Sequence, residues 1–531
     1  SLLYGTEAMG GVIRIIEEAP ADSNTQVSDI NTQLYSNTYG LSVNGGLKAT
    51  KNNRNWRIRL GLDNHADYSD GNNNRVLNSR FASYNAKASY GFTRKNWTNQ
   101  NHLYTSYSKF GFIMEDNRDR KPLDGRMSRK MDGPNHSVFF TLLSSENAIT
   151  LKSSRLELNG GIHTNLRLEN EGGHRISLNM LLNTFSYNAR WFKPLAANWE
   201  FIVGNETQYQ TNTNYGSRVI IPDAHLTESA VSVYIKKKGI VDVESGISLS
   251  ERNITTFYTQ NLNYTNNNIQ PFSRWYASFN GNAGMAVNAG QHWNMKFNIS
   301  TGYRSPNLAE LSSNGVHEGT FRYEIGNPAM KAEQNLNAEI NLNYESKVAD
   351  VYSAVFLNQF RHYIYLAPTG QQLYGFDIFR FLQDDATLHG GEFSVTVRPI
   401  AAISFTSQFS TVIGKLRNRE YLPFIPANRW TSELVLKKIT AFRNTDVSWR
   451  GGVIAVSAQK HPGLFETGTD GYVLINTGFL FVIHRPAKIS TFPLSLIIYW
   501  IKPTTITCPA LNILAFITRG ETYSFPCRYH S

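Results

Sequence analysis

Cysteine is almost absent from this chain of 531 residues: Cys508 and Cys527 are the only two, and both lie close to the C-terminus. Such avoidance suits a protein of the oxidising cell envelope, where stray thiols would react. The chain also lacks any apolar run near the ~20 residues that a membrane-spanning helix requires. A helical membrane protein is therefore excluded. A membrane β-barrel is not, because its strands need apolar side chains only at alternate positions.

Motifs of common catalytic and nucleotide-binding sites are also missing. The sequence has no P-loop, no dinucleotide-binding glycine pattern and no His-Glu-x-x-His zinc-hydrolase motif. No serine lies on a recognisable nucleophile turn. The formal net charge is +11, but no nucleic-acid-binding fold or basic helix accompanies it. We therefore expect no enzyme, no cofactor and no nucleic-acid partner.

What the chain does have is alternation of apolar and polar residues. The clearest apolar sets are Trp56, Ile58, Leu60 and Leu62; Trp293, Met295, Phe297 and Ile299; Leu336, Ala338, Ile340, Leu342 and Tyr344; and Phe393, Val395 and Val397. A period of two residues indicates strands with one apolar and one polar face. Such segments recur between residues 31 and 481 without a stretch of helical period, which favours one large closed sheet. A multi-domain soluble β-protein is the alternative.

Strand ends and connectors favour the membrane barrel. Trp56, Trp293, Tyr303 and Tyr344 stand near strand ends, where an interfacial aromatic girdle would hold them. Long connectors such as residues 115–134 are predicted external loops, and short ones are periplasmic turns. The mixed charge of that loop is typical of a mobile surface loop, and its excess of Arg and Lys also suits an anionic ligand. The lysine run 236–238 fits either a solvated turn or a rim that contacts outer-membrane lipid.

Three motifs point to one protein family. The chain opens with Ser1-Leu-Leu-Tyr-Gly-Thr-Glu-Ala-Met-Gly-Gly-Val-Ile-Arg-Ile15, in which Gly10 and Gly11 allow a tight backbone turn before a short strand. Further on it carries Tyr303-Arg-Ser-Pro-Asn-Leu-Ala-Glu310 and Gly326-Asn-Pro-Ala-Met-Lys-Ala-Glu333. Together these resemble the TonB-dependent outer-membrane receptors.

The resemblance implies an all-β fold, a large antiparallel transmembrane β-barrel of about 22 strands. It also implies three parts: residues 1–22 as the C-terminal end of a plug domain, 23–490 as the barrel, and 491–531 as an aberrant tail. The implied location is the outer membrane of a Gram-negative bacterium. The implied function is active uptake of a scarce extracellular ligand such as a ferric siderophore, haem, a metal ion or cobalamin, driven by a TonB-type energy-transducing complex. The opening motif further implies that most of the plug is missing here.

Alternatives from other classes stay open. A passive porin or an adhesin would also be an outer-membrane barrel. A signal peptide that runs directly into the first strand would indicate a porin, whereas a plug domain between the two would indicate active transport. A non-functional gene remnant is a further alternative, because the resemblance implies that most of the plug is missing and because the tail is unusual. A membrane-embedded hydrolase would need a Ser or His at the lipid interface.

The stretch between the two internal motifs supplies candidate ligand-binding residues, namely His317, Glu318 and Tyr323. Imidazole suits both haem iron and zinc, so His317 is the first to test. Alternatively, His317 packs or hydrogen-bonds within the loop, because a metal site wants three or four ligands; we assign no metal site. Glu318 and Glu324 either assist His317 or pair with Arg322.

The motif residues themselves are expected to have structural roles. These are Gly10, Gly11, Arg304, Glu310, Asn327 and Pro328. Arg304 and Glu310 are expected to form a buried pair facing the lumen, which would fix the following loop against the plug. Substrate contact is the alternative for this pair.

The tail departs from the barrel pattern. From Leu494 the alternation stops, and prolines, both cysteines and a basic end follow. If each codon is read from its third base into the next codon, Tyr499 with Trp500 gives only Leu, and Trp500 with Ile501 only Asp. The re-read tail then resembles the "NLLDK … PGRN" ending of the same family. We hypothesise a one-base frameshift between about residues 478 and 496, which would deprive the barrel of its last strands and leave an open edge.

Overall fold

A computed structural model describes most of the chain. It covers residues 9, 16–70, 73–113, 125–131, 133–171, 175–262, 268–317, 320, 322–442, 445–483, 490–501 and 521–530, with the backbone alone for 438–445 and from 481 onward. Within these residues, no helix is long and apolar enough to cross a membrane.

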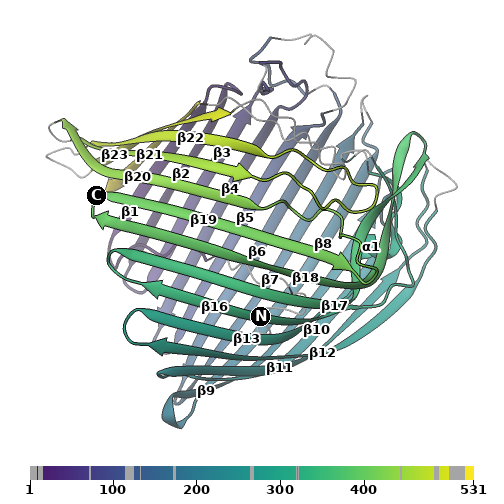
Figure 1. Cartoon of the computed structure of the whole chain (residues 1–531), viewed down its shortest axis with the longest axis horizontal. Helices are drawn as coiled ribbons and strands as arrows, with labels where there is room; N and C mark the ends of the chain where they lie inside the picture. Colours follow the sequence, from purple (N-terminus) through teal and green to yellow (C-terminus); the bar gives the residue numbers. More distant parts are fainter. Residues whose placement is uncertain are drawn as a thin grey trace.

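The strands form a closed antiparallel ring (Figure 1). Its first half consists of β1 (Gln26–Tyr35), β2 (Gly40–Lys51), β3 (Arg54–His65), β4 (Phe81–Arg94), β5 (Trp97–Gly111), β6 (Asn135–Leu151), β7 (Ser154–Asn170), β8 (Leu178–Pro194), β9 (Trp199–Asn214), β10 (Ala224–Lys237), β11 (Val241–Thr256), β12 (Ser273–Ala289) and β13 (Trp293–Arg304). Its second half consists of β16 (Glu333–Glu345), β17 (Ala349–Leu373), β18 (Phe376–Ile400), β19 (Ile403–Leu416), β20 (Arg429–Phe442), β21 (Thr445–Val456), β22 (Tyr472–Ile483), β23 (Ser490–Ile501) and β24 (Glu521–His530).

Pairing along the chain closes this ring. Each strand pairs with its neighbour in sequence, β13 pairs with β16, and β24 pairs with β1. Two short strands, β14 (Asn314–His317) and β15 (Arg322–Ile325), belong to the loop between β13 and β16 and leave 22 strands in the ring. Closure matters because an unpaired edge in hydrocarbon costs several kcal/mol per unsatisfied backbone group. The predicted all-β barrel of 22 antiparallel strands is confirmed.

The two ends of the barrel differ in their connections. At one end, which we call the turn end, residues 52–53, 95–96 and 152–153 join neighbouring strands. Asn52 and Lys95 have φ angles of 54° and 39°, the left-handed conformation that two-residue hairpin turns require. At the opposite, loop end, connections such as 66–80, 112–134 and 305–332 are long. This asymmetry agrees with the short turns and long loops expected of an outer-membrane barrel.

Side-chain exposure confirms the alternation on the strands. Ile58 and Leu60 of β3 are 52% and 61% exposed on the outside, while Arg57, the residue before Ile58, is 7% exposed and faces the lumen. Trp56 and Trp293 are exposed near the turn end, as a girdle requires. Tyr303 is different. It was expected in the girdle but is 5% exposed, because the β12–β13 ladder ends at Ser300 and the ring packs instead against loop residues.

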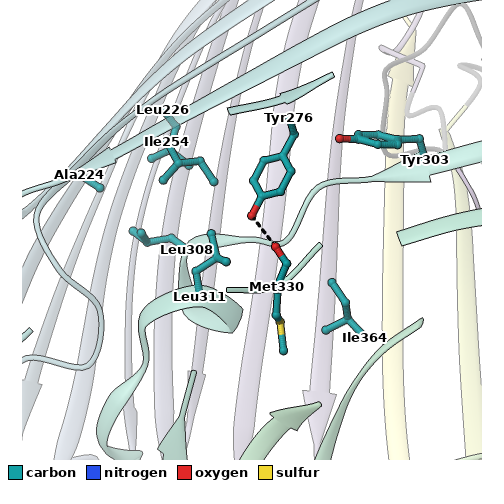
Figure 2. Packing of buried hydrophobic residues seen from close by; sticks show 9 residues of the cluster. All are labelled: Ala224, Leu226, Ile254, Tyr276, Tyr303, Leu308, Leu311, Met330 and Ile364. Carbon is teal, nitrogen blue, oxygen red and sulfur yellow. Dashed lines mark hydrogen bonds between the residues drawn. The ribbon is translucent and has the colours of Figure 1, made fainter. Parts of the chain in front are cut away.

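A buried apolar cluster lies inside the barrel at the loop end (Figure 2). The short helix α1 (Leu308–Ser312) contributes Leu308 and Leu311, which pack on inward-facing residues of the wall. The cluster consists of Ala224, Leu226, Ile254, Tyr276, Tyr303, Leu308, Leu311, Met330 and Ile364. Figure 2 shows the hydroxyl of Tyr276 donating to the carbonyl oxygen of Met330, at 3.0 Å. The β13–β16 loop therefore folds back into the barrel mouth.

The segment before β1 lies against the inner wall of the barrel. Glu17 forms ion pairs with Arg57, at 2.8 Å, and with Lys87, while Glu18 pairs with Lys48 at 2.9 Å and with Arg59 at 3.2 Å. Burial raises the pKa of each Glu, but the surrounding cations outweigh it and hold both pKa values below the usual range. Four cations from β2, β3 and β4 thus hold one short acidic segment in the lumen.

The C-terminal tail does not leave the open sheet edge that the frameshift hypothesis predicts. The backbone of β23 pairs with β22, and β24 pairs with both β23 and β1, so the C-terminal segment closes the ring. Strand ladders use backbone N–H and C=O groups, which most sequences supply whether or not their side chains alternate. The expectation that the last strands are missing was therefore wrong for the backbone. The frameshift hypothesis concerns the gene and stays a prediction.

Candidate ligand-binding site at the loop end

The β13–β16 loop is fixed at its root by a buried charge cluster. One terminal nitrogen of Arg304 donates to both carboxylate oxygens of Glu310, at 2.8 and 2.9 Å, and the other donates to Glu333 at 3.0 Å. Arg304 and Glu333 also face each other where β13 ends and β16 begins. Glu310 and Glu333 are 7% and 3% exposed. The structure thus brings Arg304 and Glu310 together and adds a second carboxylate that the sequence reasoning missed.

Helix α1 starts beside this cluster because its first turn is capped. The side chain of Asn307 accepts from the backbone N–H of Glu310 at 2.9 Å, and the Glu310 carboxylate accepts from the backbone N–H of Asn307 at 2.8 Å. This reciprocal arrangement is a capping box, which satisfies N–H groups that a helix start otherwise leaves unpaired. Glu310 therefore serves the helix and the ion pair at once.

The motif that follows the loop closes it against α1. Asn327 donates its backbone N–H to the carbonyl of Glu310 at 2.8 Å, and the carbonyl of Pro328 accepts from Arg274 of β12 at 2.6 Å. A Cβ on Gly326 would lie 2.5 Å from the backbone nitrogen of Ser312, so only glycine fits this approach. Asn327 and Pro328 thus lie at the loop root and tie it to the wall.

The tip of the loop is the β14–β15 hairpin, which carries His317. Its Nδ1 lies 3.0 Å from a carboxylate oxygen of Glu324, and Arg322 donates to the same oxygen at 2.6 Å. Because a carboxylate only accepts, Nδ1 carries the proton, so in the neutral imidazole Nε2 presents a lone pair. Burial raises the pKa of Glu324, but His317 and Arg322 outweigh it and hold the pKa below its usual range. The imidazole is 40% exposed.

The other two candidate residues at the tip, Tyr323 and Glu318, are not shown at the surface by the described structure. Tyr323 is 1% exposed, and its hydroxyl donates to the side chain of Asn314 at 2.8 Å. A side chain that contacts a ligand must be accessible, and Tyr323 is not. Its ring packs with Val316 and Ile378. Glu318 lies outside the described residues. Of the predicted ligand-binding set, the structure therefore presents His317 at the surface.

Sequence reasoning missed a buried arginine that joins three loops. Arg218, in the β9–β10 loop, is 2% exposed and donates to the carbonyl of Val316 in β14 at 3.0 Å. It also forms ion pairs with Glu169 and Glu171 at the end of β7. These partners lie far apart in the sequence, and no local pattern marks them. The β14–β15 hairpin is thus held from below by a second charge cluster.

Other predicted features have mixed outcomes. Gly10, Gly11 and most of the loop 115–132 lie outside the described residues. The lysine run is at the turn end, where Lys236 pairs with Glu200 at 2.7 Å and Lys238 with Asp242 at 3.0 Å. Among the residues that the structure describes, no group of three or more His, Cys, Asp and Glu is placed to hold a metal ion.

A family model agrees with this architecture. The model, described as TonB dependent receptor-like, beta-barrel, matches residues 10–481. The chain belongs to the TonB-dependent receptors. The anchored β13–β16 loop and the acidic luminal segment are therefore features of a TonB-dependent receptor barrel.

Solved structures share the fold of this TonB-dependent receptor. The copper transporter OprC is 11% identical and aligns over 97% of this chain and 82% of its own, with a TM-score of 0.75. The siderophore receptor PirA from Acinetobacter baumannii is 13% identical over 100% and 84%, with a TM-score of 0.72. The FrpB iron transporter (F3-3 variant) from Neisseria meningitidis is 13% identical over 96% and 81%, with a TM-score of 0.69. At these identities the likeness establishes the fold alone.

Proposed function

We propose that this chain is the barrel of an outer-membrane receptor for TonB-dependent active uptake of a scarce ligand. The candidate ligand classes are a ferric siderophore, haem, a metal ion and cobalamin. The observation that carries the proposal is the family match over residues 10–481. The matched residues include the strands that form the barrel wall up to β22 and the loops at the loop end. OprC is a copper transporter, FrpB an iron transporter and PirA a siderophore receptor. For the present chain the ligand is a proposal to be tested.

The geometry of the loop end supports binding there. A receptor needs exposed groups on a fixed base, because a pre-organised site binds with a smaller ordering cost. The Arg304 cluster and Arg218 supply the base, and the hairpin holds His317 above it with Nε2 available. A carboxylate on Nδ1 is also how proteins orient a metal-binding imidazole. We therefore propose His317 as a contact for a haem or metal-bearing ligand, and Arg304 with Glu310 as the architectural anchor.

The proposed domain division also follows from the resemblance to TonB-dependent receptors. Residues 1–22 are assigned to the end of the plug, 23–490 to the barrel and 491–531 to the tail. The ion pairs of Glu17 and Glu18 with the inner wall support the first assignment. The family match ends at residue 481, before the tail.

Uptake in cells tests the function. A strain without its own receptors would receive the complete gene that encodes this chain, and growth would be measured on single sources of ferric siderophore, haem, zinc, copper or cobalamin. Growth on one source that disappears when the TonB-type complex is deleted is the expected result. Growth that survives that deletion would identify a passive porin. Absence of a heat-modifiable protein in the outer membrane would indicate a gene remnant.

His317→Ala tests the contact, with His292→Ala as the matched control. His292 lies at the turn end, where its Nδ1 bonds the carbonyl of Glu345 at 2.7 Å. If His317 binds the ligand, its loss removes several kcal/mol of binding and abolishes growth on one source, while surface expression and the control stay normal. Unchanged growth on every source would leave His317 a role within the loop only.

A further inference from the structure

The outer face of β16–β19 changes character toward the loop end, where these strands lie side by side (Figure 1). Cross-strand partners define its rows. Farther from the loop end, Ile340 pairs with Val355, and their side chains are 47% and 54% exposed. Phe393 is 44% exposed on the same face of β18. Such side chains suit contact with hydrocarbon.

Two polar rows lie above these apolar rows. The first begins at the exposed Leu336 of β16 and runs across Gln359, Thr387 and Lys415, which pair in sequence from β17 to β19. The second begins with Gln334 opposite Arg361 and continues to Asp385, whose carbonyl accepts from the backbone of Arg417 at 2.8 Å. Since strands rise ~3.3 Å per residue, each row lies about 7 Å above the one below. The polar rows therefore occupy the level of lipid headgroups if the apolar rows contact acyl chains.

An open notch of about 480 Å³ lies in these rows. We call it the arginine notch and define it by Gln334, Gln359, Arg361, Asp385, Thr387 and Arg417. Among the described residues, neither guanidinium has an ion pair or a side-chain hydrogen bond, and both side chains are exposed. Lys415 adds a third cation nearby and lies 5.0 Å above the ring of Tyr421. Surface arginines elsewhere on this barrel, such as Arg155 and Arg398, have carboxylate partners.

A β-bulge shapes this notch. The β17–β18 register shifts between Phe360 and Tyr363, and His362 has a φ of 56°. Bulges re-aim neighbouring side chains, and this one directly follows Arg361. It also brings the backbone N–H of His362 to the carboxylate of Asp385, at 3.2 Å. The one acidic group in the notch thus already accepts a hydrogen bond, while both arginines retain their donors.

We propose that the arginine notch binds the phosphate of an anionic lipid headgroup in the outer leaflet, with the acyl chains on the apolar rows below. Arginine is suited to this role because its planar set of donors matches phosphate oxygens. Anionic lipid is also attracted to clustered surface cations. The inference depends on the proposed function for its location, since it places the loop end at the outer leaflet. It concerns the outer wall of the barrel and not the ligand site.

Lipid binding to the purified, detergent-solubilised full chain tests this. The probes are bisphosphorylated lipid A, the same lipid without phosphates, and inorganic phosphate alone, with bound lipid counted by native mass spectrometry. The double variant R361Q/R417Q is expected to bind the phosphorylated lipid about tenfold more weakly and the dephosphorylated lipid as the wild type does. The control R94Q, which removes an exposed cation at the turn end, is expected to bind both lipids normally.

Three outcomes would overturn the proposal. Equal lipid binding by R361Q/R417Q and the wild type would remove the site. An equal loss in R94Q would show a general charge effect. Displacement of the lipid by inorganic phosphate would make the notch a site for the free anion. Heat-modifiable mobility checks folding of each variant, and the single variants R361Q and R417Q replace the double one if it does not fold. Uptake assays that fail while lipid binding persists would count against the proposed function alone.

Discussion

The root and the tip of the β13–β16 loop carry charge clusters of similar composition in different surroundings. At the root, Arg304 lies between two carboxylates that are less than 10% exposed. At the tip, Glu324 accepts from Arg322 and from His317, whose ring is 40% exposed. The same chemistry is therefore an anchor in one place and a surface group in the other. The carboxylates are buried in both places, since Glu324 is 4% exposed, so the exposed imidazole of His317 is what sets the tip apart.

Arg304→Ala is expected to have the largest effect. It leaves Glu310 and Glu333 buried without their cation, and breaking a buried pair in this way costs ~3–5 kcal/mol. Urea unfolding of the barrel in lipid vesicles, followed by tryptophan fluorescence, measures the loss. Arg155→Ala is the control because its pair with Glu157 is 3.2 Å long and half-exposed. Equal destabilisation by the two substitutions would remove the distinction between anchor and surface pair.

Glu324 should make the tip sensitive to acid. Its pKa is lowered in the folded hairpin, so its stabilising contribution is present above the ordinary value of 4.5 and is lost as pH falls through the lowered value. Hydrogen bonds to charged groups are worth ~1.5–3 kcal/mol. We therefore expect amide hydrogen exchange in β14 and β15 to speed up below pH 4.5. Glu324→Gln should exchange faster at neutral pH and lack the acid step; an acid step that persists would assign it to another group.

The sequence predicts the wall of the barrel much better than its mouth. The period of two residues predicts that Ile58 and Leu60 face outward, and this prediction does not depend on which strands are neighbours. Arg304 and Glu310 were predicted to pair because a recognisable motif contains both. Arg218 and Glu169 were missed because the pairing of β7 with β8 and of β8 with β9, and not local spacing, brings them together. Tyr303 was misplaced because the end of the β12–β13 ladder is invisible in the pattern.

Tyr323→Phe should have a smaller effect than either charge substitution. It removes the hydroxyl that donates to Asn314 at 2.8 Å but keeps the ring, so a loss of ~1 kcal/mol is expected. The apolar contacts with Val316 and Ile378 are retained. Thermal unfolding of the hairpin, followed by hydrogen exchange in β15, measures it. Tyr258→Phe is a matched control, since Tyr258 is 53% exposed. No difference from this control would mean that packing alone holds the ring.

His317→Ala should have the smallest effect on stability and therefore separates binding from folding most clearly. Its imidazole is 40% exposed, so solvent screens the contact with the buried Glu324, and screened ion pairs contribute only ~0–1 kcal/mol. Arg322 still neutralises Glu324 after the substitution, so the hairpin keeps its main contact. Urea unfolding should then match the wild type within ~1 kcal/mol, while any loss of growth on one ligand source reports binding. A destabilisation near that of Arg304→Ala would show instead that the tip is as much an anchor as the root.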